Sequence, residues 1–455
     1  MRGFLVSGPG TGVGKTTVSA GLMAALRKRG LRVQPFKCGP DFIDPGHHTP
    51  LCGRPSHNLD TRMLSADQNQ RIFRSACQGA DIAVVEGMMG LFDGVQGSGL
   101  EGSSAEIAKL LGLPILLVVD ASSSAGSVAA LVHGFQTFDP ELRIAGVVLN
   151  RVSNHSHAQL LVQALRSRYP VLPVGWIPLD ERLRLKERHL GLQVAEERTW
   201  TDNEIERLAT HVQRGLPVDA FLELSQVSLP PVCDGGQGFS EPSVRIGVAR
   251  DKAFCFYYEA GLAELRSNGA ELIEFSPLND AKLPEGLDAL YFGGGYPELH
   301  AETLSANRSL ISAIRDFSEI GHPIYGECGG LIYIGRELAM LDGRKWPMAG
   351  VLPTSIQMTD RLVHFGYADL HFLEDGLAEK DTWVRGHSFH YSKLIDDGGT
   401  DKKAVAHYSL SGDTHPEGFT AGNIFGSYIH IHFAGSPLVA ARFVSLARSQ
   451  KLVQK

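Results

Sequence analysis

One stretch near the start of the chain, SGPGTGVGKTT at Ser7–Thr17, limits the possible folds more than any other feature. It follows the apolar run Phe4–Val6 and opens a helical pattern, so we expect a buried strand, a glycine-rich turn and a helix. Glycines let backbone N–H groups surround an anion, the helix N-terminus adds its positive end, and Lys15 adds a full charge. The hydroxyl of Thr16 is then placed to coordinate the Mg²⁺ that accompanies a nucleoside triphosphate. The predicted nucleotide-binding residues in this loop are Thr11, Gly12, Gly14, Lys15, Thr16 and Thr17.

The spacing of the loop departs from G-x-x-x-x-G-K-[ST], because Pro9 stands where the first glycine belongs. With G-V-G ahead of the lysine, the loop resembles the dethiobiotin synthetase and septum-site ATPase branch of the P-loop proteins. A turn without a ligand would not explain a lysine between Gly14 and two threonines. In that branch an asparagine at the end of a later strand contacts the adenine, which implies this role for Asn150 after the apolar run 144–149.

The order of the elements predicts an α/β fold. A helix over 15–29 ends at Gly30, a strand over 32–36 follows, and a strand, a helix and a strand in this order imply a parallel sheet. Further apolar runs at 81–85 and 114–119 extend this sheet, which we expect to finish near 171–178. The N-terminal half is thus predicted to be a P-loop ATPase domain with a mostly parallel sheet.

The totals exclude several classes of protein. A chain of 455 residues is too long for one ordinary core, so two domains are expected. The net charge of −7 indicates no general affinity for nucleic acid or anionic membranes. The six cysteines lack C-x-x-C spacing, which argues against a zinc site and a disulfide framework and favours a reducing cytoplasm. No long apolar segment suggests export or a membrane span.

Polar side chains follow two strands of the predicted sheet. The stretch after the second strand is expected to be a loop that holds Lys37, Asp41 and Asp44 at the edge where open α/β sheets bind ligands. Another buried strand ends in Glu86, and a buried carboxylate at this place is costly unless it meets a cation. Glu86 is therefore predicted to be a second Mg²⁺ ligand, with Asp93 nearby on a glycine-rich loop or acting only as a turn residue.

The composition changes to proline, glycine and serine between 216 and 243, which predicts a linker. The predicted domains are therefore 1–215 and 244–455, joined by this segment. The second domain begins as a new α/β unit, with a strand over 244–249, a helix over 258–268 and a strand over 272–275.

The stretch PIYGECGGLIYI at 323–334 is typical of a nucleophile elbow with sulfur in place of a serine oxygen. Cys328 stands between small residues at the start of a helix, and a helix N-terminus favours the thiolate, which is the attacking species. A cysteine nucleophile needs a base, and the predicted strand 426–433 offers His430 and His432 on one face.

These residues resemble the class I glutamine amidotransferases, which carry a cysteine at such an elbow and a histidine near the end of the domain, often followed two residues later by glutamate. The Tyr-x-His pattern favours a dyad of Cys328 and His430, with His432 as the alternative base. Because His432 occupies the place of the glutamate, the group that orients His430 stays open.

Both halves together resemble the family of cobyrinic acid a,c-diamide synthases. The resemblance rests on CGPDFIDPGH at 38–47 and RGHSFHYS at 385–392, and it covers nearly the whole chain. Two departures are His432 in place of glutamate and Ser388 where members often carry glutamate. His387 and His390 are expected to lie on a loop at the inter-domain or substrate face, with a purely structural role as the alternative.

The resemblance implies a cytoplasmic enzyme that amidates the a and c carboxylates of cobyrinic acid through acyl phosphates, with ATP, Mg²⁺ and L-glutamine. The implied roles are Mg²⁺ coordination by Thr16, Asp44 and Glu86, positions near substrate or metal for Asp41 and Asp93, and oxyanion binding near Gly294 and Gly329.

Other readings stay open. The same chemistry would serve metal-free hydrogenobyrinic acid, Ni-sirohydrochlorin or the cobyric acid synthase reaction. A septum-site-like ATPase switch is disfavoured, because that class carries a lysine five residues before the loop lysine, where this chain has Gly10. The corrin-binding residues and dimerisation cannot be read from the sequence.

Overall fold

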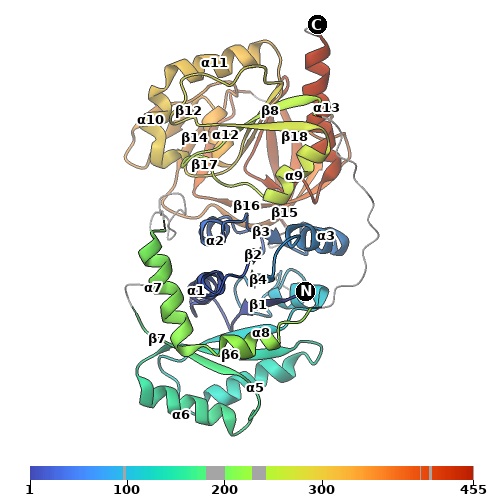
Figure 1. Ribbon diagram of the computed structural model, residues 1–455. Coiled ribbons are helices and arrows are strands. Elements are labelled where there is room, and N and C mark those ends of the chain that lie inside the picture. The colour runs from blue at the N-terminus through green and yellow to red at the C-terminus, as the bar shows by residue number, and fades with distance from the viewer. Residues whose placement is uncertain (96–98, 181–199, 228–241, 400, 409–411, 454–455) are drawn as a thin grey trace. The chain divides into compact units, whose positions relative to one another are not determined.

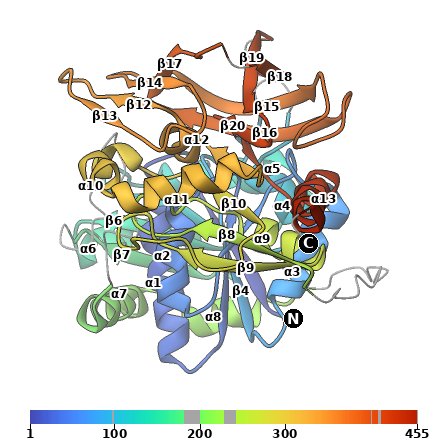
Figure 2. The ribbon, with the colours of Figure 1, turned by 90° about the horizontal axis from the view of Figure 1, so that it is seen from above.

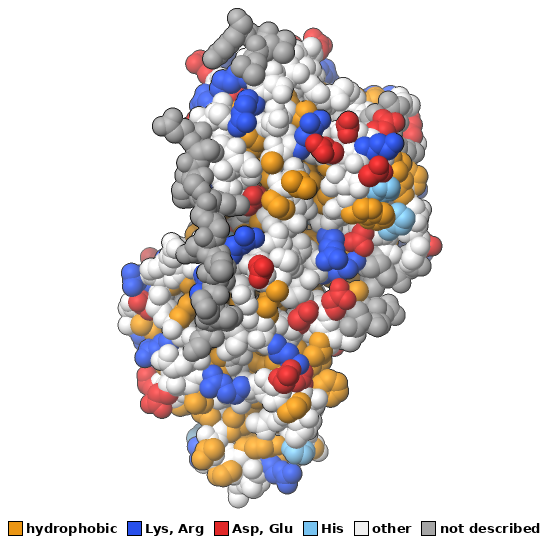
Figure 3. Space-filling view, turned by 90° about the vertical axis from the view of Figure 1, so that its right-hand side faces the viewer, with side chains coloured by type: hydrophobic (Ala, Val, Ile, Leu, Met, Phe, Trp, Pro, Cys, Tyr) orange, Lys and Arg blue, Asp and Glu red, His pale blue; other side chains and the backbone are white. Residues whose placement is uncertain are grey.

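The computed structural model describes residues 1–95, 99–180, 200–227, 242–399, 401–408 and 412–453. The chain forms two compact units, 1–234 and 235–455 (Figure 1). The described residues contain no helix that is both long and apolar enough to cross a membrane. Charged side chains of both signs are interspersed over the face drawn in Figure 3.

The first unit is built on a seven-stranded sheet in which every strand pair is parallel. The order β3-β2-β4-β1-β5-β6-β7 places β4 between β2 and β1, so the phosphate-binding loop and Glu86 meet at one edge. The predicted α/β class and parallel sheet are confirmed. The strands are β1 (Gly3–Ser7), β2 (Val33–Cys38), β3 (His57–Leu59), β4 (Ile82–Glu86), β5 (Ile115–Asp120), β6 (Ile144–Val152) and β7 (Val174–Pro178).

Helices cover both faces of this sheet, so the strands β1, β2 and β4 are buried along their whole length. One buried cluster joins Val18 of α1, Val212 of α7 and Phe221 of α8. The other face carries α3 to α6, which contribute residues such as Phe73 and Leu161 to a separate cluster. The helices are α1 (Lys15–Lys28), α2 (Ile43–Cys52), α3 (Ala66–Ala76), α4 (Ser104–Leu111), α5 (Val128–Phe138), α6 (His155–Arg166), α7 (Asp202–Gly215) and α8 (Val218–Glu223).

Part of the segment predicted as a linker is folded into the first unit. Residues 216–227 contain α8, and the N–H of Val227 donates to the carbonyl of Met1 at 2.9 Å. Phe221 is only 1% exposed, and a Cβ at Gly146 in β6 would lie 2.5 Å from its ring. The proline-rich composition concealed a short helix whose apolar side packs on the sheet. Residues 228–241 of that segment lie outside the described residues.

The second unit contains a ten-stranded mixed sheet and a four-stranded sheet. The ten strands follow the order β21-β16-β15-β18-β19-β20-β11-β10-β8-β9, and the four strands follow β13-β12-β14-β17. The part from β20 to β9 is parallel, whereas the pairs from β21 to β20 are antiparallel. Figure 2 shows β12 to β20 gathered on one side of this unit, with α9, α11 and α13 around β8 to β10.

The strands are β8 (Val244–Ala249), β9 (Ala270–Phe275), β10 (Ala289–Phe292), β11 (Ile324–Glu327), β12 (Glu337–Ala339), β13 (Lys345–Pro347), β14 (Ser355–Met358), β15 (His364–Phe372), β16 (Trp383–His390), β17 (Ser392–Asp396), β18 (Asp401–Tyr408), β19 (Thr414–Ala421), β20 (Ile424–Ser427) and β21 (His430–Ile431). The helices are α9 (Glu259–Ser267), α10 (Ala301–Ala306), α11 (Arg308–Glu319), α12 (Gly329–Ile334) and α13 (Pro437–Val453), with a 3₁₀ turn at Pro297–His300.

Three local expectations differ from the structure. The polar loop after β2 is shorter than expected, because α2 starts at Ile43. The single strand expected over 426–433 is divided, since β20 pairs with β11 and β21 pairs with β16. The loop expected for His387 and His390 is the strand β16.

The substitution Phe221→Ala tests whether α8 belongs to the core of the first unit. Deleting this buried ring is expected to lower the free energy of unfolding by about 3–5 kcal/mol. The measurement is hydrogen exchange of β6 peptides in the full chain at rising urea, read by mass spectrometry. Glu223→Ala on the exposed side of the same helix is the control and should leave the exchange unchanged. Equal exchange in both variants would show that α8 adds nothing to this core.

Two candidate active sites

The phosphate-binding loop joins β1 to α1 and is held by its neighbours. Lys15 Nζ donates to the carbonyl of Gly10 at 2.8 Å, and Asn150 Nδ2 donates to the carbonyl of Val13 at 2.9 Å. Gly14 has a φ of 95°, and a Cβ there would lie 2.1 Å from Asn150 Nδ2, so only glycine fits. Asn150 thus supports the loop itself, a contact that the sequence did not predict. Of the other predicted loop residues, Gly12 also has a positive φ, Thr11 is exposed and Thr17 is half-buried.

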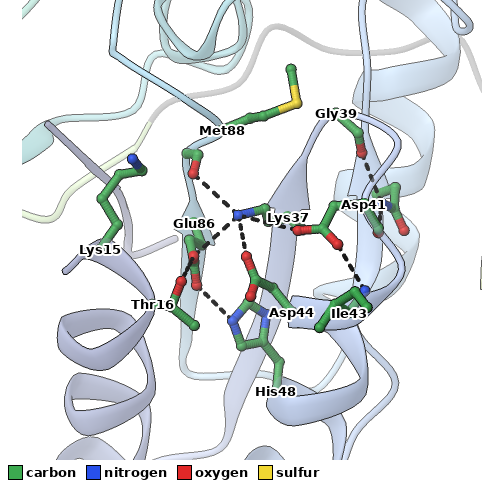
Figure 4. Close-up of polar contacts among 12 residues, drawn as sticks. Lys15, Thr16, Lys37, Gly39, Asp41, Ile43, Asp44, His48, Glu86 and Met88 are labelled. Atoms are coloured by element: carbon green, nitrogen blue, oxygen red, sulfur yellow. Dashed lines mark hydrogen bonds and ion pairs between the residues drawn. The ribbon is translucent and has the colours of Figure 1, made fainter. Parts of the chain in front are cut away.

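A cluster of charged side chains lies beside this loop (Figure 4). Lys37 at the end of β2 is in register with Glu86 at the end of β4, and its Nζ lies 3.1 Å from Glu86 Oε1. The same ammonium lies 3.6 Å from Asp41 Oδ2 and bonds Asp44 in the first turn of α2. The cation that compensates Glu86 in this structure is therefore Lys37.

Two further groups complete the surroundings of Glu86. Thr16 Oγ1 donates to Glu86 Oε1 at 2.7 Å, and His48 Nε2 lies 2.8 Å from Glu86 Oε2. His47, next to His48 in the chain, packs edge-on against Trp200 instead. The two histidines thus face different partners, as expected for adjacent residues.

The pKa values of the two buried carboxyl groups in this cluster are shifted in opposite directions. Burial alone would raise the pKa of Glu86, but Lys37 and His48 hold that pKa well below its ordinary value. Burial and the neighbouring Glu86 raise the pKa of Asp44 well above its ordinary value, despite Lys37. Burial, and then Lys37, lower the pKa of Lys15 to about 8. The arrangement therefore keeps Glu86 as the charged acceptor.

The oxygen donors of this cluster fit a magnesium ion that arrives with a nucleotide. Within the described residues there is no group of three or more His, Cys, Asp or Glu side chains that could hold a metal alone. Thr16 Oγ1 and Glu86 Oε1 nevertheless face each other at 2.7 Å, and Mg²⁺ needs only one or two such ligands when phosphates and waters supply the rest.

Asp41 and Asp93 both cap local turns. Asp41 Oδ1 accepts the N–H of Ile43 at 2.7 Å, and Asp93 Oδ2 accepts the N–H of Gly90 at 2.7 Å. The loop of Asp93 touches the phosphate-binding loop, since the N–H of Leu91 donates to the carbonyl of Gly8 at 2.8 Å. Asp93 thus stands near the phosphate-binding loop, whereas Asp41 lies beside Lys37, and the roles of both stay predictions.

In the second unit, Cys328 forms the elbow between β11 and α12. Its φ of 48° and ψ of −99° are strained for a non-glycine residue. Small neighbours permit this turn, because a Cβ at Gly330 would lie 2.1 Å from the carbonyl oxygen of Phe292. The side chain is 8% exposed, and Sγ contacts the carbonyl of Phe389 at 3.8 Å.

His430 lies beside this elbow. Burial lowers its pKa, but contacts with Cys328 and then Glu327 raise the pKa of His430 to about 9. A Cβ at Gly294 would lie 2.4 Å from its Cε1, and a Cβ at Gly329 would lie 2.9 Å from the N of Gly295. The Gly294 segment thus approaches His430 closely, the Gly329 segment approaches Gly295, and oxyanion binding by both stays a prediction.

Two histidines of the RGHSFHYS stretch also line this site. His387 is paired with His430 across β16 and β21, with the ring centroids 5.8 Å apart. His390 stacks on Tyr428 at 3.9 Å, and its Nδ1 is 2.8 Å from the carbonyl of Ser392. Burial lowers the pKa of both rings, that of His390 to about 4. The other candidate base, His432, stacks on Tyr258 at 4.5 Å.

Comparison with known proteins agrees with this arrangement. Residues 4–192 match the family described as CobQ/CobB/MinD/ParA nucleotide binding domain, and residues 245–438 match the CobB/CobQ-like glutamine amidotransferase domain. The cobyrinate a,c-diamide synthase of Syntrophotalea carbinolica is 41% identical over 98% of this chain and 99% of its own length. The cobyrinate a,c-diamide synthase of Salmonella typhimurium is 40% identical over 98% of this chain and 98% of its own length. The chain belongs to the cobyrinate a,c-diamide synthase family.

The sequence did not predict which side chains surround Glu86. The sequence placed Lys37 only on the polar stretch after the second strand and assigned no role to His48. The signal lay in strand order: once β2 and β4 are neighbours, residues at their carboxyl ends must face each other. In the nucleotide-binding unit, the sequence predicts where each strand ends but does not predict which strands are neighbours in the sheet.

The substitution Lys37→Met should destabilise the nucleotide-binding unit of this synthase family member. It leaves buried carboxylates without their cation, which is expected to cost about 3–5 kcal/mol at neutral pH. Glu86 has a lowered pKa, so its contribution is present above its unfolded pKa and is lost as pH falls. The deficit of the variant should therefore shrink toward acid pH, as read by urea-dependent hydrogen exchange of β4.

Lys109→Met is the matched control. Lys109 bonds Asp139 and Glu141 at the surface, and its loss should cost no more than about 1 kcal/mol. A deficit for Lys37→Met as small as that of the control would contradict the role given to Lys37.

Proposed function

We propose that this chain amidates the a and c carboxylates of cobyrinic acid, using ATP and taking nitrogen from glutamine. The observation that carries the proposal is family membership over 98% of the chain, with relatives named cobyrinate a,c-diamide synthase. Both halves of the reaction also have matching side chains, a phosphate-binding loop in one unit and a cysteine–histidine pair in the other.

The first half of the proposed reaction activates the carboxylate. A carboxylate does not react with ammonia until one oxygen becomes a leaving group, and transfer of the γ-phosphoryl group makes an acyl phosphate. Lys15 and the loop amides would neutralise the charge that moves during this transfer. Ammonia then attacks the acyl carbon and phosphate leaves.

Mg²⁺ would be held by Thr16 with Glu86 or Asp44, and it would neutralise phosphate charge when bound. Because Lys37 bonds both carboxylates, it would have to release at least one of them to admit the ion. Asp41 and Asp93 would lie toward the corrinoid carboxylate or the phosphates, and Asn150 would face the adenine while supporting the loop.

The second half of the proposed reaction releases ammonia from glutamine. The thiolate of Cys328 attacks the amide carbon, and N–H groups near Gly294 and Gly329 receive the oxyanion. His430 donates a proton to the departing ammonia, and water then cleaves the thioester to give glutamate. The buried imidazolium suits this role because its raised pKa keeps the proton available at neutral pH.

The first test uses amide-¹⁵N-labelled glutamine with cobyrinic acid and ATP. The protein should place two labelled nitrogens in each corrinoid molecule. Cys328→Ala should place none from glutamine but should still amidate with added ammonium, because the nucleotide-binding unit is intact. Mass spectrometry of the corrinoid gives both results.

The same assay with hydrogenobyrinic acid and Ni-sirohydrochlorin decides the substrate. Preferential labelling of either would replace cobyrinic acid as the substrate and retain the chemistry. Glutamine hydrolysis without labelling of any tetrapyrrole would retain the glutaminase and remove the corrinoid assignment. Absence of glutamine hydrolysis would overturn the amidotransferase proposal.

A pH prediction follows from His430. Its pKa is raised to about 9, so the imidazolium and its proton are present below that pH and are lost as pH rises through it. The kcat/KM for glutamine hydrolysis should therefore fall on an alkaline limb centred near pH 9. A glutaminase limb near the ordinary histidine pKa would contradict the assignment.

A further inference from the structure

A buried carboxylate stands directly before the nucleophile. Glu327 is the last residue of β11 and is 1% exposed. Its Oε1 accepts the hydroxyl of Tyr325 at 2.6 Å and the N–H of Ile431 at 3.1 Å, while Oε2 accepts the hydroxyl of Tyr291 at 2.9 Å. All three donors are neutral, so they hold the carboxylate in place without cancelling its charge.

The same carboxylate faces the histidine of the dyad. Oε2 of Glu327 lies 3.7 Å from Nδ1 of His430, both side chains being 2% exposed. The bond to the N–H of Ile431 fixes the backbone immediately after His430. One carboxylate thus constrains both the ring and the main chain of this histidine.

We infer that Glu327 is the positioning carboxylate of His430, in place of the acid that class I amidotransferases often carry two residues after the histidine. With Nδ1 turned to Glu327, Nε2 is the nitrogen that serves the thiol and the leaving ammonia. This inference rests on the proposed glutaminase reaction and names the group that the sequence left open.

The residue at the usual position is packed elsewhere. His432 is buried with its ring stacked on Tyr258 at an interplanar angle of 15°. The β21 pairing ends at Ile431, so the alternation that would bring His430 and His432 to one face does not continue.

The other titratable groups around His430 do not supply a negative carboxylate. Cys328 lies on the elbow, His387 lies on β16 and His390 lies further along that strand. Burial lowers the pKa of both histidines, so they are neutral near pH 7. Among the described groups that face His430, Glu327 is therefore the carboxylate that can stabilise the imidazolium.

The test is Glu327→Gln, which keeps the side-chain shape and removes the charge. The kcat for glutamine hydrolysis should fall on the order of 10²-fold, because general acid–base catalysis loses its orientation. The alkaline limb should move to lower pH by about one unit or more, since an opposite charge at this range raises a histidine pKa by that amount. Ammonia-dependent amidation should stay near the level of the unmodified protein.

The matched control is Glu417→Gln in β19. Glu417 is also buried and accepts a backbone N–H, that of Tyr428 at 2.9 Å, but it lies on β19, which is not a neighbour of β21 in the sheet. Its alkaline limb should not move. A limb that stays in place in Glu327→Gln, or that moves in His432→Gln instead, would overturn the inference.

A second variant covers the case in which Glu327→Gln does not fold. Tyr291→Phe removes a donor from the oxygen that faces His430 and leaves the charge of Glu327 in place. The ion pair should strengthen, so the alkaline limb should move to higher pH. A limb that stays or moves lower would count against the inference, because a merely structural loss has no reason to raise it.

The same experiment separates this inference from the proposed function. Glutamine hydrolysis by the unmodified protein and its loss in Cys328→Ala test the glutaminase. If both hold and Glu327→Gln behaves like the unmodified protein, only the assignment of Glu327 fails. If the unmodified protein does not hydrolyse glutamine, the proposed function fails first.

Discussion

Both sites depend on a carboxylate buried at the carboxyl end of a central parallel strand. Burying such a charge is unfavourable unless hydrogen bonds or a cation compensate it. Glu86 at the end of β4 meets Lys37, His48 and Thr16, whereas Glu327 at the end of β11 meets two tyrosine hydroxyls and a backbone N–H. The two compensations differ in kind, since Glu86 has a charged partner in Lys37, whereas the three donors to Glu327 are neutral and leave its Oε2 facing His430 Nδ1 at 3.7 Å.

The sequence predicted the fold class and the start of each unit because strand alternation, glycine turns and apolar runs are local signals. β8, α9 and β9 lie close to their predicted positions. The strands β12 to β19 were not predicted, since their order depends on contacts distant in sequence. The helix α8 was missed because six residues after a proline give too short a period to detect.

The candidate site was predictable to the extent that chemistry resides in short motifs. The loop around Lys15 and the elbow at Cys328 each have local glycine patterns that demand a special backbone, and the structure shows the positive φ values that these patterns imply. Lys37 opposite Glu86 has no such pattern, because two neighbouring strands make that pair. Glu327 beside His430 has none either, because β11 and β21 are brought together by the fold without being neighbours in the sheet. Residue propensity and motif spacing describe a single segment of the chain. Which segments become neighbours is decided by the fold of the whole unit.

The position of Glu327 also changes how the dyad is fixed. When the orienting acid follows the histidine on its own strand, the acid and the nucleophile belong to separate segments, and their separation varies as those segments shift. Here the acid and Cys328 are adjacent residues, so the elbow that strains the nucleophile also places the carboxylate. The N–H of Ile431 then ties the histidine strand to that same elbow through Glu327. An acidic residue after β21 is therefore not needed to orient His430, and the residue at that position, His432, packs against Tyr258 instead.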